Sequence, residues 1–270
     1  MIKKNTELQY NGLLNTPNLW ANSVVFNLKQ FQLEKQQFSF QDSSNFKEIR
    51  LGKRVEEFLS FQFKHSDDID IISKNLQIIK EKITIGELDF LLKNKSKYIH
   101  LEVVYKFYLY DPNINSNNIL KHWIGPNRKD TLSFKLNKLK EKQLPLLYSN
   151  QCKAALKNLK LDIEQIEQLV CYKAQLFLPF EKNAIDIEPL NKACIIGFYL
   201  SYSNIETLKS YQFFIPEKLD WLVIPHHKVD WMSFNELKIQ LSNFINEEYS
   251  TMVWLKSPND KLLKCFITFW

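Results

Sequence analysis

The chain has few cysteines, no long uncharged apolar run and no extended linker rich in glycine, serine and proline. Its four cysteines are far apart and form no C-x-x-C pair, which argues against a zinc site and predicts reduced thiols. No run approaches the roughly 18 apolar residues of a membrane span, and the polar start lacks the apolar core of a secretory signal. We therefore expect a cytoplasmic protein that does not enter a membrane.

The composition is that of a folded protein with a mild basic bias. The 270 residues are 45% hydrophobic, enough for one sizeable domain or a domain with an appendage. The formal net charge is +6, and basic side chains cluster near residues 128–142. Because a nucleic-acid surface needs clustered charge more than total charge, nucleic acid is the partner we expect.

Two segments place charged side chains in runs that otherwise resemble buried strands, residues 86–92 and 100–108. Side chains alternate between the faces of a strand, so Glu87 and Asp89 share one face, and His100, Glu102 and Lys106 share another. If the strands pair as a hairpin through the turn at 94–97, Asp89 and Glu102 converge. Such carboxylates bind a hard divalent cation or form ordinary ion pairs, and the residue pattern leaves both interpretations open.

The surrounding segments predict an ordered set of helices and strands. Apolar residues at helical spacing predict helices at 51–64 and 129–142, the second carrying Leu132, Leu136 and Leu139 on one stripe. Strands are predicted at 69–80 and 169–180, in addition to the two charged segments. The order is therefore α-β-β-β-α-β.

This order, with its acidic residues, resembles the PD-(D/E)XK nuclease superfamily. Glu56 matches the acid of the first helix, Asp89 the aspartate of the second strand and Glu102 the glutamate of the third. The superfamily lysine is expected two residues after the glutamate, where this chain has Val104. Lys106 is the nearest lysine on that face of the strand.

The resemblance implies an α/β fold with a restriction-endonuclease-like αβββαβ core, a central mixed sheet and a β-rich C-terminal extension. It implies a nuclease that hydrolyses phosphodiester bonds of DNA or RNA with Mg²⁺ or Mn²⁺. Asp89, Glu102 and Glu56 would be the metal ligands, and Lys106 would position water or stabilise developing negative charge.

A second resemblance covers most of the chain. The string from Trp123 to Asp130, WIGPNRKD, followed by QLPL at 143–146, is similar to an uncharacterised bacterial family built on a domain of unknown function. Members of that family also resemble this chain in carrying a lysine four residues after the strand glutamate, where Lys106 stands. The displaced lysine is then a family trait.

Residues Arg128, Lys129 and Lys135 are the candidate nucleic-acid contacts. In one interpretation, the turn at 125–127 leads into a helix whose free amides and adjacent basic residues face a phosphate. In the other, Asn127 is an N-cap residue and the lysines form a solvated face.

Two further residues are candidates for supporting the site. Gln143 resembles a glutamine that some PD-(D/E)XK branches place on the helix after the catalytic strands, or it is a helix-end amide. His100 shares the polar face of its strand, as a metal neighbour or as a structural hydrogen-bonding group.

The predicted divisions are a mostly helical N-terminal flank at 1–47 packed on the core, a core at 48–180 and an extension at 181–270. In the extension, apolar runs predict strands at 195–200, 221–224 and 251–255, with a helix at 233–246. Two other functions stay open beside the nuclease. One is a catalytically inactive nucleic-acid-binding or assembly module, and the other is an interaction domain in which Glu102 pairs with Lys106.

Overall fold

The computed structural model describes residues 2–34, 50–181 and 185–270. They fall into two compact units, each built from separate stretches of chain. The first unit comprises Met1–Pro17, Lys106–Ser133 and Ala174–Trp270, and the second comprises Asn18–Tyr105 and Phe134–Lys173. The predicted boundary at 47/48 lies outside the described residues, and the three predicted domain ranges stay a prediction.

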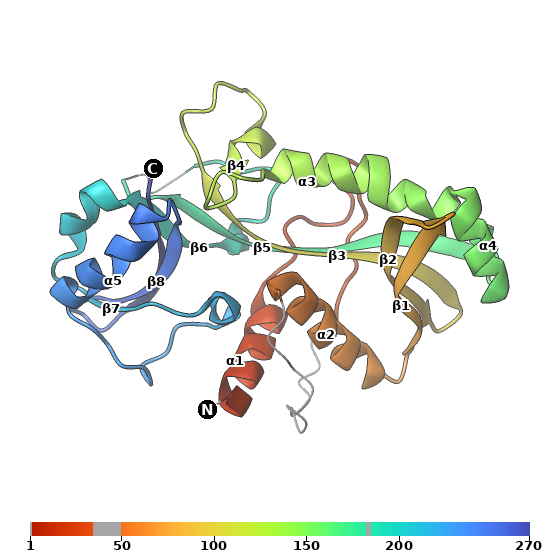
Figure 1. Cartoon of the computed structure of the whole chain (residues 1–270), viewed down its shortest axis with the longest axis horizontal. Coiled ribbons are helices and arrows are strands. Elements are labelled where there is room, and N and C mark those ends of the chain that lie inside the picture. The colour runs from red at the N-terminus through yellow and green to blue at the C-terminus, as the bar shows by residue number, and fades with distance from the viewer. Residues whose placement is uncertain (1, 35–49, 182–184) are drawn as a thin grey trace. The chain divides into compact units, whose positions relative to one another are not determined.

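Unit 2 contains the charged strands. Helix α2 (Leu51–Lys64) precedes β1 (Ile69–Lys80), β2 (Ile83–Asn94) and β3 (Lys97–Tyr110), and these bounds agree with the predicted helix and strands. Consecutive strands pair antiparallel, and Asn94 opposite Lys97 closes the predicted turn between β2 and β3. Figure 1 shows the hairpin of β1 and β2 curling away from the longer strands.

The apolar stripe of α2 explains its position against the sheet. Phe58, Leu59 and Phe63 are fully buried, and Phe63 packs edge-on against Phe90 of β2 with ring centroids 5.4 Å apart. This spacing of apolar residues repeats every three to four positions and forms one apolar face, beside which Arg54 and Glu56 are also buried. Burial of the stripe therefore fixes which way the acids of α2 point.

The second predicted helix begins later than expected and changes geometry along its length. Helix α3 (Leu132–Lys138) continues into a π-helical turn (Leu139–Gln143), a 3₁₀ helix (Leu144–Tyr148) and α4 (Asn150–Asn158). Pro145 lies in the first turn of the 3₁₀ helix, directly after the π-helical turn. The buried stripe of Leu132, Leu136 and Leu139 is confirmed.

Both interpretations placed the turn at 125–127 at the start of a helix, and this placement was wrong, because α3 begins only at Leu132. Phosphate contact by Arg128 and Lys129 stays a prediction. The amide of Gly125 bonds to the carbonyl of Asp130, which closes a turn before the helix begins at Leu132. The side chain of Asn127 instead accepts a hydrogen bond from the amide of Ser250 at 2.7 Å. The tight turn, centred on left-handed Arg128 with φ 56°, separates this segment from the helix.

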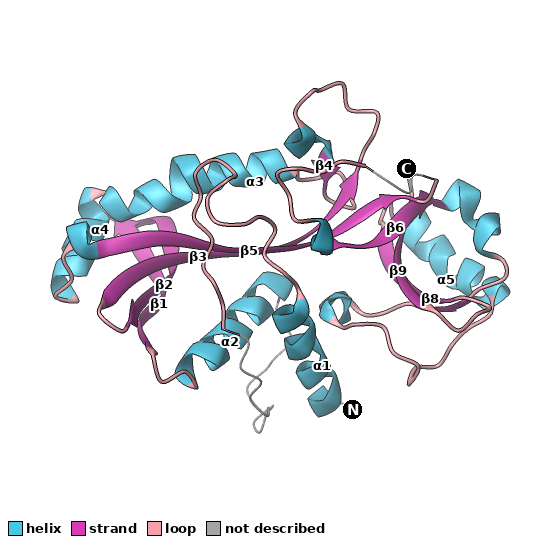
Figure 2. Cartoon of the chain, turned by 180° about the vertical axis from the view of Figure 1, so that it is seen from behind, coloured by secondary structure: helices cyan, strands magenta, loops and turns pink. Residues whose placement is uncertain are grey.

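The strands form a large mixed sheet in the order β1-β2-β3-β5-β6-β9-β8-β7, with β4 (Trp123–Ile124) beside β3. Strand β5 (Ile166–Pro179) pairs parallel with β6 (Ile195–Ser201), which pairs parallel with β9 (Leu262–Thr268). Strands β8 (Thr251–Lys256) and β7 (Gln212–Phe214) complete unit 1 and pair antiparallel. Figure 2 labels β6, β8 and β9, and Figure 1 labels β7. The predicted α-β-β-β-α-β order and the β-rich character of the C-terminal part are present.

Helices cover part of the sheet in unit 1. Helix α5 (Phe234–Asn246) starts with a capping box formed by Ser233 and Glu236, close to the predicted start at 233. Helix α1 (Ile2–Asn15) packs against a 3₁₀ helix at Lys218–Leu222. None of the described helices has the length and apolarity that a bilayer crossing requires. All four cysteines are free and buried, as expected of reduced thiols.

The strand predicted at 221–224 was wrong. Trp221 and Leu222 end a 3₁₀ helix, and both are buried beneath α1. Asp220 accepts hydrogen bonds from the side chains of Asn5 and Gln9 at 3.0 and 2.6 Å, which fixes this turn against α1. A short apolar run is buried equally well in a strand or a helical turn, so its sequence did not distinguish them.

Two glycines provide a matched test of this packing. A Cβ atom at Gly197 in β6 would lie 2.2 Å from the backbone oxygen of Lys264 on β9, whereas one at Gly52 would meet nothing within 4 Å. We expect Gly197→Ala to lower the free energy of unfolding by about 1–3 kcal/mol, because the paired strands must separate. Gly52→Ala should raise it by about 0.5–1 kcal/mol by favouring the helix. Urea denaturation of both variants checks the pair, and a neutral Gly197→Ala would contradict the close strand contact.

Candidate metal centre

The site forms where the ladder between β2 and β3 ends. The last pair in that register is Phe90 with Leu101, so Asp89 is the first residue of β2 beyond the ladder. Its Oδ2 accepts a hydrogen bond from the backbone amide of Val103 at 2.8 Å. On the other side, β1 has Asn75 in the left-handed region with φ 54°. The carboxylate thus satisfies a β3 amide at an irregular point of the sheet.

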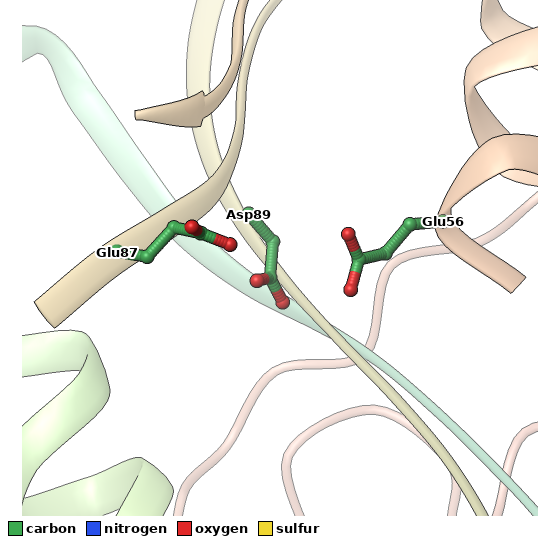
Figure 3. A group of neighbouring side chains, drawn as sticks. All are labelled: Glu56, Glu87 and Asp89. Atoms are coloured by element: carbon green, nitrogen blue, oxygen red, sulfur yellow. The ribbon is translucent and has the colours of Figure 1, made fainter. Parts of the chain in front are cut away.

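Three carboxylates converge at this point. Glu56 of α2, and Glu87 and Asp89 of β2, each offer an oxygen atom, and these three atoms lie within 4.8 Å of one another. Figure 3 shows the side chains pointing toward a shared space, with Glu56 reaching across from its helix. Strand alternation places Glu87 and Asp89 on one face, while α2, held by its buried apolar stripe, presents the buried side chain of Glu56 to them.

Lys53 bridges part of the cluster. Its Nζ lies 2.8 Å from Glu56 Oε2, 2.8 Å from Glu87 Oε1 and 3.3 Å from Asn75 Oδ1. Burial lowers the pKa of Lys53, but the hydrogen bonds to Glu56 and Glu87 outweigh it and hold that pKa above its ordinary value. The pKa of Glu56 is raised by burial, which Lys53 opposes. One lysine therefore neutralises only part of the charge of these acids.

Asp89 is the most perturbed acid of the cluster. Burial, and secondarily the charge of Glu102, raise its pKa to about 8, although the Val103 amide and Lys135 favour the ionised form. Without a bound cation, this carboxyl therefore holds a proton at neutral pH. A group whose charge is opposed in this way is a frequent feature of functional sites.

Glu102 lies behind Asp89 and is fully buried. Its Oε1 is 3.0 Å from His100 Nε2, and its Oε2 accepts a hydrogen bond from the Gln143 amide at 2.5 Å. Gln168 Nε2 donates to His100 Nδ1 at 3.0 Å, and this leaves the proton of the neutral imidazole on Nε2, directed at Glu102. His100 is thus a hydrogen-bonding partner of Glu102.

The end of the π-helical turn brings Gln143 to the site. While its amide nitrogen donates to Glu102, its Oε1 accepts a hydrogen bond from Lys135 Nζ at 2.8 Å. Lys135, expected at a nucleic-acid surface, is half-buried and acts electrostatically on Asp89. Gln143 therefore links a cation of α3 to the buried acid of β3.

Lys106 has a different partner. Its Nζ pairs with Asp130 Oδ2 at 2.5 Å, and both residues belong to unit 1. The ion pair between Glu102 and Lys106 considered for an interaction domain was therefore wrong. The short turn that ends at Asp130 presents this carboxylate to Lys106, which sequence spacing alone did not reveal.

The remaining basic candidates lie in two environments. Arg128 pairs with Asp111 at 2.7 Å and lies over the ring of Trp270, 4.5 Å from its centroid. Lys129 is exposed, as are Lys138, Lys140 and Lys142 further along the chain. These lysines, and Arg128 in spite of its two contacts, retain the solvent-facing position expected of phosphate contacts.

The sequence prediction named Asp89, Glu102 and Glu56 as ligands, and the structure brings Asp89 and Glu56 together but leaves Glu102 outside the three-carboxylate cluster. Glu87 belongs to the three-carboxylate cluster but was missing from the predicted set, although the period-two spacing with Asp89 signalled it. Lys53 was also missed, and its position three residues before Glu56 on the helix was the signal.

Comparison with known proteins identifies the family. A family model described as a domain of unknown function, DUF1853, matches residues 10–262. The chain belongs to the DUF1853 family. A search of curated proteins gave no match, and none of the solved structures matched the chain. The residues matched by DUF1853 include every side chain of the acidic cluster and its hydrogen-bonded neighbours.

Proposed function

We propose that the protein is a nuclease of PD-(D/E)XK type that hydrolyses phosphodiester bonds of DNA or RNA with Mg²⁺ or Mn²⁺. The single observation that carries this proposal is the convergence of Glu56, Glu87 and Asp89, whose oxygen atoms lie within 4.8 Å of one another. They come from the first helix and the second strand of the α-β-β-β-α-β order.

The donor set fits a hard divalent cation. All three donors are carboxylate oxygens, which Mg²⁺ and Mn²⁺ prefer to nitrogen or sulfur ligands. Burial, and secondarily the charge of Glu102, raises the pKa of Asp89, so the ionised carboxylate lacks sufficient stabilisation from its present neighbours. A cation on Glu56, Glu87 and Asp89 would supply that stabilisation.

The chain's own residues would hold the cation and set its electrostatic environment. A bound cation would supply Lewis acidity toward a phosphoryl oxygen and lower the pKa of a water molecule. Glu56, Glu87 and Asp89 would hold it, and Asp89 is kept in position by the Val103 amide. Glu102, fixed between His100 and Gln143, sets the electrostatic environment of Asp89 from behind.

We assign the superfamily lysine's role to Lys53 in preference to Lys106. Lys53 Nζ is hydrogen-bonded to two of the three proposed ligands, and its side chain is 45% exposed, so it can reach a bound phosphate. Lys106 has Asp130 as its ion-pair partner. An ammonium group beside the ligands can orient water or stabilise the charge that develops on phosphate.

Lysine substitutions test this assignment. We expect Lys53→Ala to cut metal-dependent cleavage by about 10²–10⁴-fold, the range typical of a positioned proton-transfer or electrostatic group. Lys106→Ala should lower it by less than about tenfold. The assay measures cleavage of single- and double-stranded DNA and RNA, with Mg²⁺, Mn²⁺ or EDTA. If Lys106→Ala loses most of its cleavage activity while Lys53→Ala stays active, Lys106 has the role of the superfamily lysine, as the sequence predicted.

The second candidate is a nucleic-acid-binding module of the same fold that lacks turnover. Val104 at the expected lysine position and the partnering of Lys106 with Asp130 favour it. The exposed basic residues Lys129, Lys138 and Lys142 would then contact phosphates. In the same assay, this module would show no cleavage of any substrate but would bind nucleic acid with an affinity that falls steeply with salt.

A further inference from the structure

Unit 1 contains a cavity that has no part in the acidic site. Its volume is about 330 Å³, near the lower end of the range for small-molecule sites. The walls combine the end of α1 with β6, β9 and the segment after Leu222, and they are mainly apolar. Lining residues include Pro17, Ile196, Leu222, Ile224 and Leu262. Four polar residues also line it: Asn15, Thr16, Gln175 and Lys264.

Lys264 is a buried amine that forms no ion pair with a carboxylate of the described residues. Its residue exposure is 4%, and its Nζ donates to Gln175 Oε1 at 3.0 Å and to the Trp221 carbonyl at 2.6 Å. Burial alone lowers the pKa of Lys264 to about 7. Because buried charges are normally paired, a lysine in this setting lacks the group that would stabilise its charged form.

We propose that this cavity binds a small organic carboxylate with an apolar body, and that Lys264 is the residue that recognises the carboxylate. The apolar walls suit the body of such a ligand, and the ammonium suits its head. A protonated amine has three N–H donors. Gln175 and Trp221 accept two of them, which leaves the third for a carboxylate oxygen.

The same hydrogen bonds favour a carboxylate over a carbonyl ligand. An amine that condenses with an aldehyde gives up two hydrogens as water leaves, so the protonated imine keeps a single N–H and cannot donate to both Gln175 and Trp221. A bound carboxylate keeps both contacts and adds a charge-assisted hydrogen bond, which is stronger than a neutral one. The geometry therefore supports reversible binding.

Calorimetric titration of the full chain tests the proposal, with hexanoate, octanoate and phenylacetate as probes and octanamide as the neutral match for octanoate. We expect saturable binding of at least one carboxylate, and octanamide should bind at least about tenfold more weakly than octanoate. Lys264→Met should weaken carboxylate binding by a similar factor. Lys209→Met, at an exposed lysine of the same unit, should leave it unchanged.

A second variant keeps the test decisive if Lys264→Met fails to fold. Ala193 is exposed and lines the cavity, so Ala193→Trp should obstruct it while leaving Lys264 in place. Loss of binding in this variant supports the site. The proposal is overturned if no probe binds below about 1 mM, if octanamide binds as tightly as octanoate, or if Ala193→Trp and a folded Lys264→Met bind like wild type.

Discussion

In the Asp89→Asn variant we expect Mn²⁺ to lose its stabilising effect. A cation that binds only the folded protein should stabilise wild type by about 2.7 kcal/mol at a concentration 100 times its Kd. Asp89 is one of three converging carboxylates, so the amide removes a third of the donor charge. We also expect cleavage to fall by at least about 10²-fold, because even residues that only orient metal ligands cost 10–100-fold when replaced.

The measurement is the melting temperature over a series of Mg²⁺ or Mn²⁺ concentrations, with cleavage assayed in parallel. Asp260→Asn is the matched control, because the side chain of Asp260 is 71% exposed and belongs to unit 1. It should respond like wild type. If the cation raises the melting temperatures of Asp89→Asn and wild type equally, it binds elsewhere and the proposed metal centre is wrong.

The second large effect is a pH dependence of stability without added cation. The pKa of Asp89 is raised from 3.8 to about 8 in the folded protein, chiefly by burial. Between these values the folded state retains a proton that the unfolded state loses, so this group makes stability fall as pH rises. Asp89→Asn removes the titration. The free energy of unfolding of Asp89→Asn minus that of wild type should therefore increase by at least about 1 kcal/mol between about pH 5 and about pH 8. One pKa unit corresponds to 1.36 kcal/mol.

Urea denaturation in EDTA at about pH 5, 6.5 and 8 measures this difference. Parallel stability curves for wild type and Asp89→Asn would show that Asp89 titrates normally. The same linkage predicts that Mn²⁺ binds wild type more tightly as pH rises toward about 8, because the cation and the proton compete for one carboxylate.

Most elements followed from the sequence because their patterns match their final burial. The apolar positions of α2 and the leucine stripe of α3 repeat at helical spacing, and both stripes are buried. The turn between β2 and β3 also lies where its polar residues predicted. The segment at 221–224 was misassigned because its burial beneath α1 depends on Asp220 bonding to residues more than 200 positions away.

For the candidate site, the sequence determined which carboxylates share a strand face. Of the three ligands it predicted, Glu56 and Asp89 lie in the converging cluster, whereas Glu102 is hydrogen-bonded to His100 and Gln143. Only the tertiary structure decided that Glu87 joins the cluster and that Lys53 is hydrogen-bonded to its acids. It also decided that Lys106 forms an ion pair with Asp130. The reason is physical. Strand alternation fixes a side chain's face, but a lysine's long stem reaches several carboxylates, and which one it meets depends on where turns and helices place them.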